Sequence, residues 1–134
     1  MSYTRNDYSS IIEAREVIHG FYLSALDKYP EIPKTLLSHY IGVSIKACSR
    51  DGDLGKQKDF IKLLNFLDFL ETIGYLHHRQ AVTAIEVNEL LGNSIVYFFE
   101  IYKPYILQRR QKDPKFYGKL ECLYNEVKKE RNNN

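Results

Sequence analysis

The fold of this chain is decided by residues 60–73, which read FIKLLNFLDFLETI. Apolar side chains recur there at helical spacing and cover more than half of the helix circumference. The polar stripe that remains holds only Lys62, Asn65, Asp68 and Thr72. We predict a helix over about residues 56–76, and because it is apolar on most sides we expect it to lie centrally and to touch several neighbours.

The segments on either side also show helical periodicity, and none alternates for long enough to predict a strand. Thr83 and Glu86 have capping-box spacing, and Tyr29-Pro30 ends a helix. Pro104 lies inside a helical pattern and is expected to kink or restart that helix. Further helices are predicted over about residues 8–28, 33–50, 83–92, 94–111 and 114–128.

These ranges predict an all-α fold, a compact bundle of five to six helices joined by short loops. The length of 134 residues fits a single helical domain over residues 1–134. We expect residues 1–7 and 129–134 to be frayed, because chain ends without apolar anchors rarely pack.

Composition and charge narrow the class of protein. The 19 basic and 17 acidic residues give a net charge of +2, whereas a nucleic-acid-binding protein usually has a larger basic excess. The polar N-terminus carries no secretory signal, and no apolar run is long enough to cross a membrane. Cys48 and Cys122 fit no metal-binding spacing and favour a reducing compartment, with one disulfide between them as the open alternative. We expect a cytoplasmic protein.

The sequence contains no phosphate-binding loop and no G-x-S-x-G, H-E-x-x-H or C-x-x-C pattern. Residues 51–55 begin like a calcium loop, but Lys62 stands where a bidentate glutamate is needed. His77-His78 is the sole histidine pair, and it suits a helix C-terminus better than a metal site. We therefore predict no catalytic residue, no metal and no cofactor.

One carboxylate, Glu71, lies inside the apolar arc of the central predicted helix, where an uncompensated charge is costly. Arg15 and Arg109 interrupt the apolar arcs of two other predicted helices. We predict that Glu71 pairs with Arg15 or Arg109 inside the bundle, a structural ion pair that fixes the register of the helices. The alternatives are that Glu71 serves a ligand pocket or catalysis, or that it reaches solvent.

Basic side chains form a second candidate surface. His39, Lys46 and Arg50 recur on one side of the predicted helix over residues 33–50, and Lys56, Lys58 and Lys62 follow nearby in sequence. Such a group can contact the phosphates of a nucleic acid or another anion, and more often it is simply a solvated face.

Tyrosine is the predominant aromatic residue, because the chain has 11 Tyr and 7 Phe but no Trp. Because tyrosine joins a large apolar body to a polar tip, these residues suit either the edge of a core or a protein interface.

Residues 60–124 resemble a family of uncharacterised bacterial and phage helical domains, a "domain of unknown function". The resemblance rests on residues 63–74 (LLNFLDFLETIG), 84–87 (AIEV) and 91–95 (LGNSI). The family tends to show an apolar helix with an L-N-F-x-E motif, then a short turn, a small helix and an aromatic-rich helix. Glu71 falls where the glutamate of that motif would be, although residues 67–70 separate it from Asn65-Phe66 here. The resemblance implies a helical fold and transfers no catalytic residue.

The absence of catalytic motifs and the tyrosine content favour a non-enzymatic module that binds another protein. It would be a regulator, an inhibitor or an adaptor of the kind encoded by a phage or other mobile element, and it could also self-associate. The less favoured alternatives are a nucleic-acid-binding protein that uses the basic surface, and a ligand-binding protein or enzyme built around Glu71.

Overall fold

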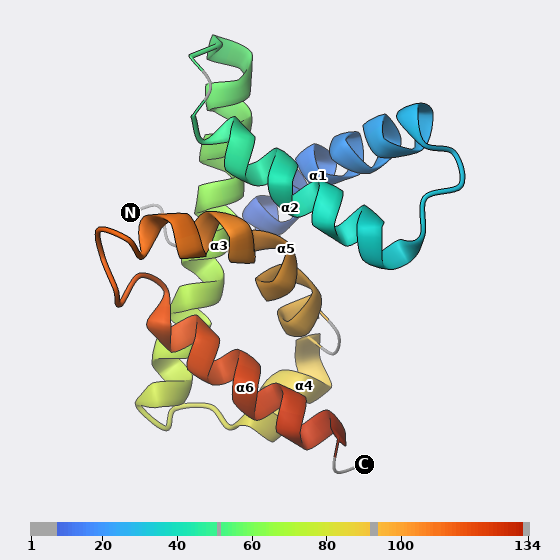
Figure 1. The fold of residues 1–134 in the computed structure, drawn as a ribbon. Coiled ribbons are helices and arrows are strands. Elements are labelled where there is room, and N and C mark those ends of the chain that lie inside the picture. Colours follow the sequence, from blue (N-terminus) through green and yellow to red (C-terminus); the bar gives the residue numbers. More distant parts are fainter. Residues whose placement is uncertain (1–7, 51, 92–93, 133–134) are drawn as a thin grey trace.

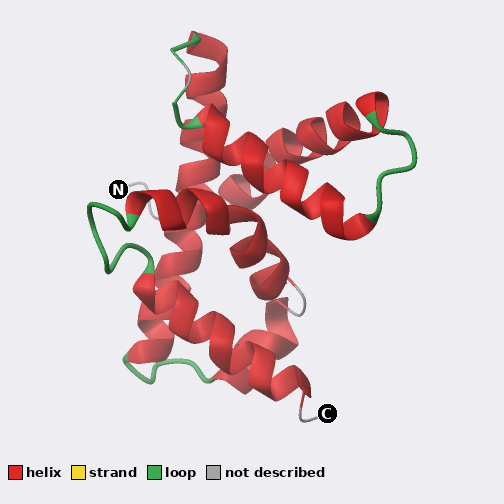
Figure 2. Ribbon diagram, viewed as in Figure 1, coloured by secondary structure: helices red, strands yellow, loops and turns green. Residues whose placement is uncertain are grey.

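The computed structural model describes residues 8–50, 52–91 and 94–132, and within these ranges every regular element is a helix (Figures 1 and 2). The prediction of an all-α bundle of five to six helices is therefore confirmed. In chain order the helices are α1 (Tyr8–Lys28), α2 (Lys34–Cys48), α3 (Leu54–His78), α4 (Ala84–Leu91), α5 (Ser94–Arg109) and α6 (Gly118–Asn132). Residues 1–7, which we expected to be frayed, lie outside the described residues.

Helix α3 lies centrally, as its apolar sequence predicted. It packs against α1 and α2 along one part of its length and against α6 along another (Figure 1). Its residues Leu63, Phe66, Leu67 and Leu70 are buried in the core. The helix begins earlier than expected because Asp53 caps it, accepting a hydrogen bond from the N–H of Lys56 at 3.1 Å.

Helices α2 and α5 pack closely at a glycine and a proline. A Cβ added to Gly42 would lie 3.0 Å from both the carbonyl oxygen of Ile101 and Cγ of Pro104. Pro104 stands inside α5, which continues through it as one helix and bends along its course (Figure 1). The sequence left a kink or a restart open, and the structure shows the kink.

Helix α6 begins later than the sequence predicted. The sequence predicted a helix from about residue 114, but residues 114–117 form turns and α6 starts at Gly118. Tyr117, directly before it, has a φ of 54°, in the left-handed region, which ends the preceding turn. Residues 129–132, expected to be frayed, form the last turn of α6, and residues 133–134 lie outside the described part.

The tyrosines divide between core and surface. Tyr102 is buried and donates a hydrogen bond to the carbonyl oxygen of Leu63 at 2.7 Å, which links α5 to α3. Others, among them Tyr22, Tyr29, Tyr75 and Tyr97, leave more than a third of their side chains exposed. None of the helices in the described part combines the length and apolar character needed to cross a membrane.

Candidate functional site

The misfit carboxylate of Glu71 lies where α3 meets the first turn of α6. The backbone N–H of Leu120 donates a hydrogen bond to Glu71 Oε1 at 2.6 Å, and the neighbouring N–H of Lys119 also favours the charged form of this carboxylate. These N–H groups belong to the first turn of α6, where no carbonyl of the same helix can accept from them. Glu71 therefore caps α6 from another helix and also complements the positive end of its dipole.

Gly74, one turn further along α3, allows this contact. A Cβ at Gly74 would lie 2.6 Å from the carbonyl carbon and oxygen of Lys119, far inside van der Waals contact. Asp68, one turn before Glu71, accepts a hydrogen bond from the hydroxyl of Tyr117. Asp68, Glu71 and Gly74 thus form one stripe of α3 that receives the start of α6.

The expected ion pair between Glu71 and Arg15 or Arg109 is not found among the described residues. Arg15 is exposed on α1, and Arg109 is exposed at the end of α5, with its guanidinium 4.9 Å from the ring centre of Phe116. The neighbouring Arg110 forms the ion pair at this junction, with Glu121 at 2.6 Å. Backbone N–H groups satisfy Glu71 instead, and a helical wheel cannot show such donors.

The electrostatics of Glu71 follow from this position. Burial raises the pKa of its carboxyl above the ordinary value, because the charged form loses hydration. The N–H groups of Leu120 and Lys119 and the charges of Lys119 and Arg110 oppose that shift without cancelling it. Burial and the hydrogen bond to Asp68 likewise raise the pKa of Tyr117. Asp68, Glu71 and Tyr117 thus lie together where α3 meets the start of α6.

The predicted basic surface is not uniformly positive. His39 and Lys46 lie on α2 away from its buried residues Ile41 and Ile45, and Arg50 lies in the turn that follows α2. Lys62, in contrast, lines a hollow against α1 together with the acidic Glu16 and Asp59.

Lys56 and Lys58 are exposed in the first turns of α3, and the carbonyl oxygen of Lys56 accepts from the thiol of Cys48 at 3.0 Å. The six predicted residues therefore face different surroundings, which weakens the case for an extended anion-binding face.

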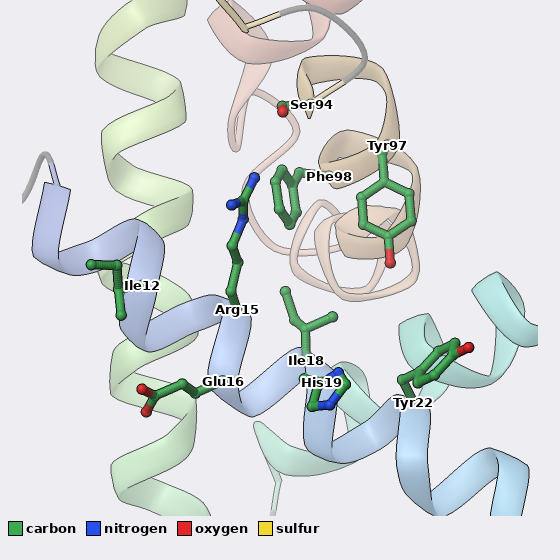
Figure 3. A pocket seen from close by; sticks show the side chains of 9 residues that line it. All are labelled: Ile12, Arg15, Glu16, Ile18, His19, Tyr22, Ser94, Tyr97 and Phe98. Atoms are coloured by element: carbon green, nitrogen blue, oxygen red, sulfur yellow. The ribbon is translucent and has the colours of Figure 1, made fainter.

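A groove of about 890 Å³ opens between α1 and the start of α5 (Figure 3). Helix α1 contributes six lining residues and α5 contributes three: Ile12, Arg15, Glu16, Ile18, His19 and Tyr22, and Ser94, Tyr97 and Phe98. We call this surface the α1–α5 groove. Ile18 and Phe98 are its buried residues, 6% and 4% exposed.

Large apolar side chains stand open to solvent around this groove. Ile12, Tyr22 and Tyr97 are 45%, 37% and 39% exposed. His19 stacks on Tyr22, with 5.8 Å between ring centres, and Tyr97 meets Phe98 edge to face at 5.2 Å. Partial burial raises the pKa of the Tyr97 phenol. The rings are thus held by one another, and a preformed aromatic surface suits binding.

The two charged side chains of the groove, Arg15 and Glu16, point in different directions. Figure 3 shows Arg15 extending from α1 toward Phe98 and Ser94, while Glu16 points to the other side of the helix. Within the part of the chain that the structure describes, neither side chain forms an ion pair. The groove can therefore hold an apolar segment that carries a carboxylate for Arg15.

Sequence reasoning singled out Arg15 but placed it inside the bundle, and it missed Ile12, His19 and Tyr97. The apolar arc of α1 is wide, and its buried residues Ala14 and Val17 belong to the core while Ile12 and Tyr22 line the groove. The sequence feature that pointed to this groove was Arg15, a charged residue at the edge of a wide apolar arc.

Among the described residues no group of three or more His, Cys, Asp or Glu side chains is placed to hold a metal ion. His77 and His78 form the last turn of α3, as expected. Cys48 is buried and Cys122 is exposed, and both are free thiols. The alternative of one disulfide between them is therefore wrong.

The fold and the site together define an all-helical domain with a tertiary helix cap at its centre and an open aromatic groove on its surface. The chain belongs to the family described as "Domain of unknown function (DUF4760)", whose model matches residues 3–127. The resemblance seen over residues 60–124 is confirmed, and it extends over nearly the whole chain. No curated protein and no solved structure matches the chain.

Proposed function

We propose that this chain is a non-enzymatic module that binds a protein segment through the α1–α5 groove. One observation carries the proposal: three large, partly exposed apolar side chains surround an arginine without an ion-pair partner in the described structure. Contiguous exposed apolar surface marks interaction sites, and aromatic residues and arginine are the residue types most enriched at the centres of protein interfaces.

We extend the proposal to a regulatory role, as an adaptor or inhibitor encoded by a phage or other mobile element and working in the bacterial cytoplasm. The resemblance to bacterial and phage domains supports the source. The cysteines support a reducing compartment, because neither forms a disulfide although Cys122 is exposed.

The test is affinity capture from the cell that carries the gene, with a tagged chain as bait. Ile12→Glu places a charge in the groove and is expected to lose the stoichiometric partner that the wild type retains. The matched control is Leu107→Glu, since Leu107 is 50% exposed, is also aliphatic and helical, and lies outside the lining of the groove. The proposal fails if no stoichiometric protein is retained, or if both variants retain it equally.

A further inference from the structure

We infer that the segment bound in the α1–α5 groove is helix α4 of a second copy of this chain, with Glu89 of that copy against Arg15. The inference rests on the proposed function and names the partner. Two surfaces of the same molecule carry it, the groove already described and the outer face of α4.

The outer face of α4 is apolar and acidic at once. Ile85 and Leu90 are 53% and 82% exposed, and Glu86 and Glu89 are exposed between them. At 100° per residue these four side chains share an arc of about 140°. The opposite side of α4 is already occupied, because Val87 is buried in the core and Ala84 and Leu91 pack against it.

One of the two carboxylates is available for a partner. Glu86 accepts from the N–H of Thr83 at 2.9 Å, in the capping box that the sequence predicted. Glu89 forms no hydrogen bond or ion pair within the described residues. Arg15 likewise forms no ion pair in the groove, so the two surfaces offer each other opposite charges at Arg15 and Glu89.

The shapes agree as well as the charges. Helix α4 has eight residues, which corresponds to a length of about 12 Å. Ile12 and Tyr22 stand ten residues apart on α1, a span of about 15 Å along the groove. Both walls of the groove are helices, so a helix fits there and a strand would find no sheet edge to pair with.

Each copy has one groove and one α4, so a twofold axis lets both contacts form at once and closes the dimer. The apolar ends of Ile85 and Leu90 then cover Ile12 and Tyr97, and burial of apolar surface supplies the attraction. The pair of Arg15 and Glu89 supplies register and selects this arrangement over others.

The test is the mass of the protein in solution, measured by light scattering over a range of concentrations. The wild type is expected to be a dimer that dissociates on dilution. Arg15→Glu and Glu89→Arg are each expected to be monomeric, because each places like charges in contact. An equimolar mixture of the two variants is expected to dimerise. In the mixed dimer one contact pairs Arg15 with Glu89 as in the wild type, and the other pairs the two introduced side chains, whose charges are exchanged.

Glu31→Arg is the control, since Glu31 is an exposed acidic residue in the loop between α1 and α2, and it should leave the dimer intact. Circular dichroism checks that each variant is folded. A wild type that is monomeric at every concentration overturns the inference, and so does a mixture that stays monomeric or a dimer that survives both substitutions. None of these results shows whether the groove binds a different protein. The capture experiment described above tests that proposed function separately.

Discussion

The carboxylate of Glu71 on α3 accepts the backbone N–H of Leu120 on α6 at 2.6 Å, across 49 positions of sequence. A side chain from one helix thus completes the first turn of another, and no acceptor within α6 can do so. The contact explains why a charged residue stands among the apolar side chains of the central helix α3. It makes Glu71 a structural residue, whose loss should affect stability.

Replacing Glu71 with alanine is expected to lower the free energy of unfolding by about 2 kcal/mol, because the charge-assisted hydrogen bond from Leu120 is lost and its donor stays partly buried. Glu71→Gln should cost less, since its amide oxygen can still accept from Leu120. Urea denaturation measures both. Equal stability of all three proteins would mean that water caps α6 equally well.

The stability conferred by Glu71 should depend on pH in a defined direction. Its folded pKa is raised above the ordinary value of 4.5, so the folded chain holds the proton more tightly than the unfolded chain. As pH rises from about 4.5 through the folded pKa, the wild type should lose stability relative to Glu71→Gln, which does not titrate.

Denaturation of both proteins across this pH range isolates that difference, because all other groups titrate alike in the two. A wild type that instead gains stability over Glu71→Gln as pH rises would show that the N–H groups outweigh burial.

Gly74 is expected to tolerate no side chain. Its added Cβ would meet the backbone of Lys119 at 2.6 Å, and backbone cannot swing aside as a flexible side chain does. Gly74→Ala should therefore destabilise the protein by about 3 kcal/mol through overpacking.

The matched control is Gly20→Ala, in the interior of α1, where an added Cβ meets nothing within 4 Å. It should stabilise the protein by about 0.5 kcal/mol or more through helix propensity. Thermal melts of both variants check the contrast, and similar melting temperatures would contradict it.

The helices could be predicted from sequence because their signals are local. The bounds of α1 match the prediction, and the capping box at Thr83 and Glu86 forms as expected. The start of α6 could not be predicted in this way. The sequence pattern placed it near residue 114, but the left-handed Tyr117 and the tertiary contact from Glu71 decide where the helix begins.

The partners of charged groups were the least predictable part. A helical wheel identified Glu71 as a misfit, yet its partners are backbone N–H groups, which every sequence contains and none displays. Arg15 was likewise identified as a misfit, but its apolar surroundings proved to be the lining of an open groove. The periodicity of one helix shows that a face is apolar, and it does not show whether another helix of the same chain covers that face.

Two adjacent arginines at the end of α5 should differ sharply in their effect on stability. Arg110 is 19% exposed, pairs with Glu121 at 2.6 Å and donates from Nε to the carbonyl oxygen of Phe116 at 2.9 Å. Arg110→Ala leaves these partners without their donor and should cost about 2 kcal/mol. Arg109 is exposed and lies over the ring of Phe116, so Arg109→Ala should cost less than about 1 kcal/mol.

Arg110→Lys separates charge from geometry at the same position. Lysine keeps the positive charge but cannot reach Glu121 and the carbonyl oxygen of Phe116 together with a planar fork, so it should recover only part of the loss. Urea denaturation of the three variants ranks them. If Arg109→Ala proves as harmful as Arg110→Ala, the turn between α5 and α6 is held by the cation on the Phe116 ring, and the ion pair with Glu121 contributes little.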